Sequence, residues 1–455
     1  MADAATAYLV DFLQTRDRAP ASDLDHALDL ARALREPVPE RGVDFAALLR
    51  TIAEGATKGF DTAGPGYLAF IPGGGLFAAS IADYVADTIN RFVGIWNPAP
   101  VLAQMEWMAL RWFCDLFDYP EAGRGILTSG GSMANFSAIV TARAARLPEN
   151  FLSGTLYTTD QTHASVAKAA ALAGFPLTNV RRVPTTPELR MDLGALRRAV
   201  RDDREAGFQP FCLVVSAGTT NTGAVDPLAD AATVAGQEDL WLHVDGAYGG
   251  FFQLTDRGRA RFTGIDRADS IVLDPHKGLF LPYGTGALLV RDGAALRAAH
   301  QVGAHYLQDL APEGEIPNFA DYSPELSRDF RGLRVWLPIK LHGLAAFREA
   351  LDEKLDLARL LYDELASVPG FQLPWEPELT VVAFRYQPRV GEANAFNRRL
   401  LDRINASRRI FLSSTLIGDR YTLRACIVSH RTHRDRIEEA AKIISSAASE
   451  LEGGA

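Results

Sequence analysis

Lys277 is the residue whose place in the chain most directly suggests chemistry. It follows the apolar run Ser270–Leu273, which has the composition of a buried strand and is ended by Asp274-Pro275. A lysine just past such a strand, between His276 and the flexible Gly278, is a candidate nucleophile, because partial burial favours the neutral amine. Most lysines are solvated charges, so this interpretation depends on segments that come earlier in the chain.

A segment rich in glycine and serine, residues 127–135, follows one predicted strand and begins a helix. Its glycines let backbone N–H groups turn toward an anion, Ser132 adds a hydroxyl, and the helix N-terminus adds favourable potential. The segment matches neither the Walker nor the dinucleotide fingerprint. Taken alone, it is more often an ordinary serine–glycine helix cap.

Three further polar positions follow other predicted strands. Asp245 ends an apolar run, and a buried carboxylate needs a cationic partner, for which a protonated pyridine nitrogen would serve. His163 lies at a strand-to-helix junction, where its flat ring could stack on a planar cofactor. Residues 216–223 bring hydroxyls to another strand end. The simpler alternatives are a loop-capping aspartate, a surface or capping histidine and a polar turn.

Together, these segments supply a phosphate loop, a ring-stacking histidine, a hydroxyl donor, a carboxylate for a pyridine nitrogen and an imine-forming lysine. One cofactor, pyridoxal 5′-phosphate (PLP), accounts for all five features. The chain resembles the fold-type I, group II PLP decarboxylases, the family that includes aromatic L-amino acid decarboxylase. The resemblance covers about residues 60–430 and is strongest at Asp160–Ser165, His243–Tyr248 and Asp274–Lys277.

The resemblance implies a role for each matching residue. Lys277 would form the internal aldimine, and Asp245 would pair with the pyridine nitrogen. The remaining cofactor contacts would be Ala247 and His163 on the two ring faces, Gly131, Ser132 and His276 at the phosphate, and Thr220 near the ring hydroxyl or the substrate carboxylate.

Tyr306, in Gly303-Ala-His-Tyr306, matches the family's catalytic loop, where a tyrosine protonates the quinonoid intermediate. Phenylalanine at that place goes with aldehyde-forming relatives, so Tyr306 favours decarboxylation to the amine and CO₂. Arg328 matches a family arginine and is expected to serve structural pairing within the site. We therefore expect a carboxy-lyase, with His163 and Asp245 assisting Lys277 and Tyr306.

Two positions depart from the family pattern. The family often has asparagine, a phosphate contact, where this chain has Asp274. Because an anion facing the phosphate would be repelled, Asp274 is expected to turn away or to offer only its backbone. The expected substrate-pocket residues, Phe70, Ile71 and Pro72, replace a more aromatic and polar set. No arginine is evidently committed to a distal carboxylate, which favours an aromatic or other apolar amino acid over glutamate.

Several alternatives stay open at this point. The same fold supports PLP-dependent aldehyde synthases, aminotransferases and carbon–carbon lyases. A different class of protein would bind PLP, or act as a scaffold, without catalysis. The presence of both Lys277 and Tyr306 counts against that class.

The periodicity of the sequence predicts the elements that position these residues. Short apolar runs alternate with helix-like segments between about 125 and 292, which is typical of an α/β fold with a mainly parallel sheet. Ligands of such sheets bind at the carboxyl ends of the strands, where the polar segments fall. The seven predicted strands are 126–127, 156–158, 180–183, 211–215, 240–244, 271–273 and 287–290.

We expect three parts in the chain: a helical dimerisation segment at 1–60, a large PLP-binding domain at 61–340 and a small α+β domain at 341–455. The last should contain a long helix at 345–365, strands at 379–385 and 421–428, and a closing helix at 434–448. The apolar stripes of 1–60 cannot bury themselves alone, and relatives pair, so a homodimer with sites at its interface is expected.

Composition excludes several classes of partner. The 455 residues carry 47 Lys and Arg against 56 Asp and Glu, a net charge of −9, which argues against nucleic acid or an anionic membrane. The three cysteines, Cys114, Cys212 and Cys426, share no metal-ligand spacing and indicate no disulfide framework. No apolar run approaches the ~18 residues of a membrane span, and the N-terminus lacks a signal-peptide pattern, so a cytoplasmic location is expected.

Overall fold

The computed structural model describes residues 1–301 and 314–453, which fold into two compact units. The larger unit comprises residues 73–355 and 377–379, and the smaller comprises 1–72, 356–376 and 380–455. The N-terminal and C-terminal segments therefore belong to one unit. No periodicity in the sequence indicated this grouping.

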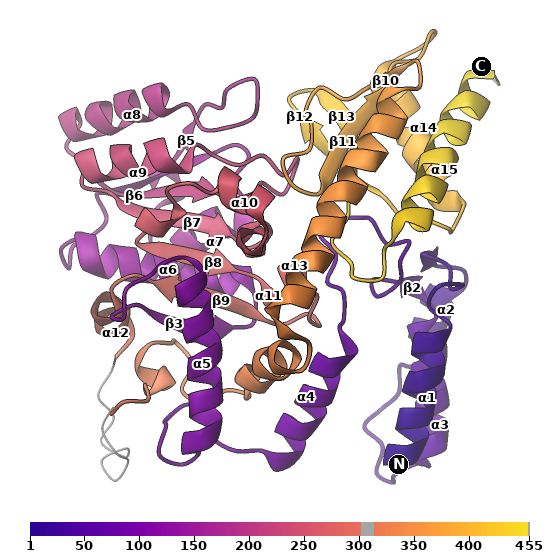
Figure 1. The fold of residues 1–455 in the computed structure, drawn as a ribbon, viewed down its shortest axis with the longest axis horizontal. Coiled ribbons are helices and arrows are strands. Elements are labelled where there is room, and N and C mark those ends of the chain that lie inside the picture. Colours follow the sequence, from indigo (N-terminus) through magenta and orange to yellow (C-terminus); the bar gives the residue numbers. More distant parts are fainter. Residues whose placement is uncertain (302–313, 454–455) are drawn as a thin grey trace. The chain divides into compact units, whose positions relative to one another are not determined.

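The larger unit is built on a seven-stranded sheet with the strand order β3-β9-β8-β7-β6-β4-β5 (Figure 1). Neighbouring strands from β8 to β5 are parallel, whereas β9 is antiparallel to both β3 and β8. All seven strands expected from the apolar runs are present, and the predicted fold class is confirmed. The strands are β3 (Arg124–Thr128), β4 (Gly154–Thr159), β5 (Val180–Val183), β6 (Gln209–Ser216), β7 (Trp241–Gly246), β8 (Ser270–Leu273) and β9 (Gly286–Val290).

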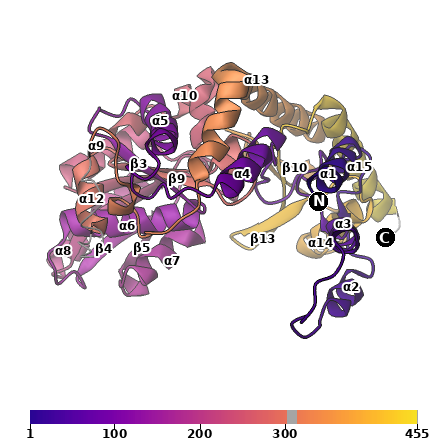
Figure 2. The same ribbon diagram turned by 90° about the horizontal axis from the view of Figure 1, so that it is seen from below.

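Helices cover both faces of this sheet, which is why its central strands, such as β7 and β8, are buried on both sides. Small residues of α6 and α7, among them Ala138 and Ala169, pack with Ile126, Val214 and Val272 of the strands on one face. Helix α5 lies on the other side of β3 and β9 (Figure 2). The covering helices are α5 (Pro100–Leu116), α6 (Gly131–Arg146), α7 (Ala164–Leu172), α8 (Leu193–Glu205), α9 (Leu228–Gln237) and α12 (Gly293–His300).

The other helices of this unit connect and flank the sheet. Helix α13 is interrupted at Gly343, whose φ of 74° and ψ of 157° are not helical, and it contains Pro338. Its bounds extend into the smaller unit. These helices are α4 (Phe77–Ile89), α10 (Asp256–Arg261), α11 (Pro275–Gly278) and α13 (Arg331–Ala366).

The smaller unit contains an antiparallel sheet with the order β10-β11-β13-β12. The predicted strand pair and closing helix are present, while β12 and α14 were not predicted. A short pair, β1 with β2, accompanies three N-terminal helices in which none of the described residues is buried. The elements are α1 (Ala2–Gln14), β1 (Ser22–Asp23), α2 (Ala27–Ala33), α3 (Phe45–Ala56), β2 (Gly59–Phe60), β10 (Phe371–Gln372), β11 (Val381–Tyr386), α14 (Ala393–Ala406), β12 (Ser413–Ile417), β13 (Arg420–Cys426) and α15 (Arg434–Gly453).

Within the two described stretches, no helix has the length and apolar character that crossing a membrane requires. The three cysteines are buried, and none of them forms a disulfide. No group of acidic, histidine and cysteine side chains suited to a metal ion occurs among the described residues.

Candidate active site

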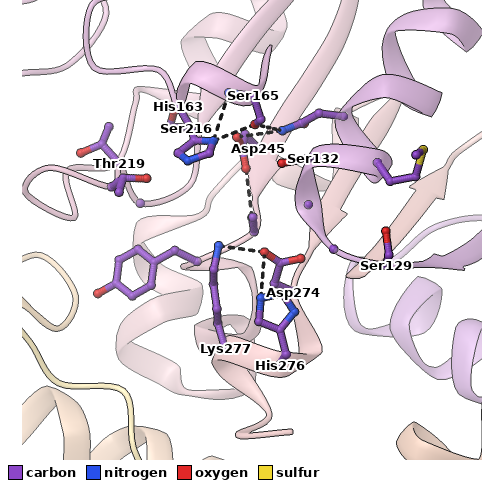
Figure 3. Close-up of a pocket in the computed structure, with 18 residues that line it drawn as sticks. Ser129, Ser132, His163, Ser165, Ser216, Thr219, Asp245, Asp274, His276 and Lys277 are labelled. Atoms are coloured by element: carbon purple, nitrogen blue, oxygen red, sulfur yellow. Dashed lines mark hydrogen bonds and ion pairs between the residues drawn. The ribbon is translucent and has the colours of Figure 1, made fainter. Parts of the chain in front are cut away.

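A cavity of about 260 Å³ lies in the larger unit, where β3, β4, β6, β7 and β8 end (Figure 3). Parallel strands bring their carboxyl ends to one edge, so loops far apart in sequence meet there. All eight expected cofactor residues line this cavity: Gly131, Ser132, His163, Thr220, Asp245, Ala247, His276 and Lys277.

Lys277 enters the cavity from the short helix α11, directly after β8. Its Nζ lies 2.8 Å from Oδ2 of Asp274, and the two side chains are 23% and 3% exposed. The expectation that Asp274 turns away was wrong: its carboxylate faces the cavity, as Figure 3 shows. The attraction of the Lys277 ammonium group, which repulsion from a phosphate does not take into account, holds the carboxylate in this position.

The start of α6 lines the side of the cavity where the sequence predicts an anion site. Gly130 has a φ of 149°, a conformation that favours glycine, and it turns the chain from β3 into the helix. A Cβ on Gly131 would lie 3.0 Å from Oδ2 of Asp274 and 3.2 Å from the Cβ of Ala247, so this approach needs glycine. The unpaired N–H groups of the first turn and the exposed Ser132 hydroxyl are then available to an anion.

His276 lies beside this anion site. Its Nδ1 is 2.6 Å from the backbone oxygen of Thr285, which can only accept, so Nδ1 carries the hydrogen. Its Nε2 lies 3.6 Å from Oδ2 of Asp274. Burial lowers the pKa of His276, which favours the neutral ring in this environment.

Asp245, at the end of β7, is 7% exposed and is held by neutral donors. The backbone N–H of Ala247 donates to its Oδ1 at 3.1 Å, and the amide of Asn135 donates to its Oδ2 at 3.3 Å. Among the described residues, no side-chain cation pairs with it. A buried carboxylate without a cation is costly, so the charge of Asp245 is available to a cationic group of a ligand.

A hydrogen-bonded chain supports Asn135 from behind. Because an indole only donates, Trp241 donates to Ser270 Oγ at 2.8 Å, which leaves the hydroxyl to donate to Nδ1 of His243 at 2.8 Å. Nε2 of His243 then donates to Oδ1 of Asn135 at 2.9 Å. Burial lowers the pKa of His243 to about 4, consistent with this neutral tautomer. The side chains of Trp241, Ser270, His243 and Asn135 are called the Asn135 relay below.

Asn135 also connects the relay to His163. Its amide donates to Ser165 Oγ at 2.9 Å, and that hydroxyl lies 2.7 Å from Nδ1 of His163. His163 caps α7, accepting the backbone N–H of Ser165 at 3.2 Å. The same amide group therefore orients the carboxylate expected at the pyridine nitrogen and the ring expected to stack on the cofactor.

Thr220 lies in the loop that follows β6 and lines the cavity with its neighbour Thr219. Asp226 fixes the base of this loop by accepting the backbone N–H groups of Ser216 and Met191, both at 2.7 Å. Burial raises the pKa of Asp226 to about 6. The Asp226 carboxylate thus ties the start of the hydroxyl-bearing loop, at Ser216, to its end and to the separate segment that contains Met191.

The remaining predicted residues do not meet in this cavity. Phe70, Ile71 and Pro72 belong to the smaller unit and are absent from the described cavity lining. Phe70 is 54% exposed, and its φ is 55°. The substrate role of these three residues stays a prediction. Tyr306 lies outside the described residues.

Arg328 forms a structural ion pair, as expected, but within the described structure it does not line the cavity. Its Nη2 lies 2.5 Å from Oε1 of Glu106, and the two side chains are 1% and 0% exposed. The other oxygen of Glu106 accepts the backbone N–H of Gly332 at 3.1 Å. This pair therefore joins α5 to the start of α13.

Sequence reasoning assigned no role to Asn135, Ser165 or His243, although each has a positional signal. Asn135 is one helical turn beyond Gly131, and His243 is two residues before Asp245 on the same side of a strand. Ser165 likewise follows His163 by two residues. Polar residues at these intervals from a candidate site residue indicate possible supporting contacts.

The fold and the cavity define a protein of the fold-type I PLP class. The chain matches the pyridoxal-dependent decarboxylase conserved domain over residues 28–387. It is 34% identical over 450 residues to an aromatic-L-amino-acid decarboxylase of Bacillus atrophaeus, covering 97% of this chain and 94% of that one. The chain therefore belongs to the pyridoxal-dependent decarboxylase family and is a PLP-dependent decarboxylase.

Two further proteins are similar to this chain over most of their length. The crystal structure of Oryza sativa TDC with PLP and tryptamine superimposes with a TM-score of 0.93, at 27% identity, over 99% of both chains. A phenylacetaldehyde synthase of Arabidopsis thaliana is 29% identical over 407 residues, covering 85% of this chain and 82% of that one. Relatives with different named activities thus share this chain's sequence pattern.

The residues present fit PLP. Asp245 has no cationic partner among the described side chains, as a site for a protonated pyridine nitrogen requires. The start of α6 offers an anion site, and the Lys277 amine reaches the same cavity. The donor set therefore matches the phosphate, ring nitrogen and aldehyde of the cofactor.

Proposed function

We propose that this protein converts an L-amino acid with an aromatic or other apolar side chain to the corresponding amine and CO₂. The observation that supports this most directly is the meeting of Lys277, Asp245 and the start of α6 in one cavity. The aromatic-L-amino-acid decarboxylase of Bacillus atrophaeus, at 34% identity, supports the aromatic substrate class.

PLP, when bound, supplies a conjugated ring that accepts the electrons released as the Cα–carboxylate bond breaks. We propose that Lys277 binds the cofactor through its amine and later regains that bond, releasing the product. Asp245, held by Asn135 and the Ala247 N–H, keeps a proton at the pyridine nitrogen. The proposed proton donor to Cα is the hydroxyl of Tyr306.

The surrounding residues have binding and orienting roles in this proposal. Gly131 and Ser132 bind the phosphate with His276, and Ala247 packs on one face of the ring while His163 stacks on the other. Thr220 lies near the ring hydroxyl or the substrate carboxylate. The neutral, buried relay behind Asn135 limits rotation of the Asp245 carboxylate, so its charge stays aimed at one point.

An absorbance and product assay tests this function. The purified protein should show an imine band that the Lys277→Ala variant lacks, and it should release CO₂ and amine from aromatic L-amino acids. A band without CO₂ from any amino acid would refute the decarboxylation proposal. Absence of any band after reconstitution with PLP would contradict the proposed cofactor site.

The similarity to phenylacetaldehyde synthase keeps an aldehyde-forming reaction as the second candidate. The two reactions differ in products, since the synthase reaction also needs an oxidant such as dioxygen, which takes up two electrons, and water, and it yields aldehyde and ammonia in place of the amine. We expect amine from the wild type and a shift toward aldehyde in Tyr306→Phe. Aldehyde as the main wild-type product would favour the second candidate.

We further propose that Phe70, Ile71 and Pro72 contribute to substrate selection. The Phe70→Leu variant should change the ratio of kcat/KM between phenylalanine and tryptophan and leave the affinity for PLP within about twofold of the wild type. Leucine keeps an apolar side chain of moderate size, which limits the effect to shape. An unchanged ratio would exclude Phe70 from the substrate pocket.

We propose a homodimer in which exposed apolar residues of α2 and α3, such as Leu28, Leu48 and Ile52, and Leu24 just before α2 lie in the subunit interface. Sedimentation should then show a dimer, and a fully active monomer would contradict it. The proposed cytoplasmic location is tested by cell fractionation.

A further inference from the structure

Asp274 is a buried carboxylate at the edge of the anion site. It is 2% exposed, and its Oδ2 contacts Nζ of Lys277 at 2.8 Å. Its Oδ1 is buried and has no hydrogen-bond partner among the described residues. Both oxygens lie close to the start of α6, since a Cβ on Gly131 would be 3.0 Å from Oδ2 and 3.3 Å from Oδ1.

This position creates an electrostatic conflict with the cofactor. A phosphate bound by the N–H groups of Gly131 and Ser132 would lie beside the Asp274 carboxylate. Two anions sharing a buried site cannot both stay fully charged, because neither is solvated and each repels the other. At pH 8 a free phosphate monoester is mostly a dianion, since its second pKa is about 6.

The groups that face Asp274 offer limited compensation. Lys277 is the cation in direct contact, and it is the residue that we propose commits its amine to the cofactor. His276 is 3.6 Å away, and its Nδ1–H is already used by Thr285. Arg334, on α13, is engaged by Asp83 at 2.7 Å and by the hydroxyl of Thr285 at 2.8 Å. Among the described residues of α6 and β7 that line the cavity, the one titratable side chain is that of Asp245, which is another acid.

We propose that Asp274 makes cofactor binding proton-linked: the carboxylate pairs with Lys277 in the cofactor-free protein, and one proton is taken up between Asp274 and the phosphate when the cofactor binds. The shared proton converts the repulsion into a hydrogen bond from one anion to the other. Cofactor affinity then falls as the pH rises. This inference concerns the cofactor, so it holds whichever amino acid is the substrate.

Pyridoxine 5′-phosphate separates the phosphate contact from covalent chemistry, because it has no aldehyde to react with Lys277. We would titrate it into the full-length, cofactor-free protein by calorimetry at pH 8, in two buffers of different ionisation enthalpy, which reports the protons taken up. The wild type should take up about one proton, and Asp274→Asn should take up close to none. Between pH 7.5 and 8.5, wild-type affinity should fall about tenfold and that of Asp274→Asn much less.

Two controls make the result specific. Ser132→Ala removes a proposed phosphate donor without a titrating group, so it should weaken binding and keep the uptake of one proton. Pyridoxine, which lacks the phosphate, should bind the wild type without proton uptake at pH 8. If Asp274→Asn does not fold, the difference between these two ligands on the wild type still tests the proposal.

Several results would overturn it. Equal proton uptake by the wild type and Asp274→Asn would assign the proton to another group. Absence of uptake by the wild type at pH 8 would show that the carboxylate and the dianion are accommodated together. Equal uptake with pyridoxine would remove the phosphate from the explanation.

Discussion

Replacing Asn135 with leucine should lower the free energy of unfolding by about 3–5 kcal/mol. Asn135 is 1% exposed and makes hydrogen bonds to Ser165 at 2.9 Å, Asp245 at 3.3 Å and His243 at 2.9 Å. Leucine has the same number of side-chain heavy atoms as asparagine and is not smaller, so none of the effect comes from a cavity. An unpartnered buried N–H on His243 costs about 1–3 kcal/mol, and a lost bond to a charged Asp245 costs about 1.5–3 kcal/mol. Ser165 keeps His163 as a partner and adds little.

Urea unfolding of the cofactor-free protein at pH 7.5, followed by circular dichroism, measures this loss. Ser137→Ala is a matched control, because Ser137 is on the same helix, is 0% exposed, and its hydroxyl has no partner in the described structure. That variant should change the free energy of unfolding by less than about 1 kcal/mol. In the His243→Leu background, Asn135→Leu should lower the free energy of unfolding by less than it does in the wild type, because the His243 N–H that would lose its partner is absent.

Equal stabilities for Asn135→Leu and Ser137→Ala would refute the view that the relay is held by hydrogen bonds. Additive effects of Asn135→Leu and His243→Leu would show that these two side chains do not interact. Either result would also remove the physical basis for a fixed Asp245 orientation.

Other perturbations test the same structure. The pKa of His243 is about 4 in the folded protein against 6.5 in the unfolded chain, so the unfolded chain binds the proton first as the pH falls. The contribution of His243 to the free energy of unfolding is therefore complete above pH 6.5, and about 3 kcal/mol of it is lost as the pH falls toward 4. The His243→Gln variant should show a smaller loss in urea titrations across that pH range. Glu106→Ala leaves Arg328 buried without its acid and should cost about 3–5 kcal/mol, measured by chemical unfolding, with Glu106→Gln costing less. Gly131→Ala crowds the anion site and should weaken PLP binding at least about tenfold, whereas Gly236→Ala, with no atom within 4 Å of the added Cβ, should not.

The central sheet was predictable because burial on both faces leaves a direct mark on sequence. Strands such as Ser270–Leu273 and Gly286–Val290 are short and mostly apolar, and polar residues follow many of the strands. Since parallel strands end at one edge, the meeting of His163, Asp245 and Lys277 followed from topology alone. Local composition was sufficient for this part of the molecule.

The smaller unit shows where local composition is insufficient. The backbone N–H of Leu68 donates to the oxygen of Phe411 at 3.0 Å, and that of Cys426 donates to the oxygen of Leu68 at 2.8 Å. These contacts join segments more than 340 residues apart, and no periodicity in either segment specifies its partner. The strand Ser413–Ile417 was not predicted, because serine and threonine fill its first half.

Asp245 and Asp274 show why the orientation of site residues needed the structure. Both are buried carboxylates at the ends of adjacent strands. From the sequence, Asp245 was expected to have a cationic partner and Asp274 to turn away from the phosphate. In the structure the first is held by neutral donors and the second by Lys277. The free negative charge at Asp245 then suits a pyridinium, while the charge at Asp274 is balanced only as long as Lys277 remains an ammonium. A phosphate bound beside Asp274 would add a second anion to this pair, and the proton-uptake experiment measures whether the charge of Asp274 or of the phosphate then changes.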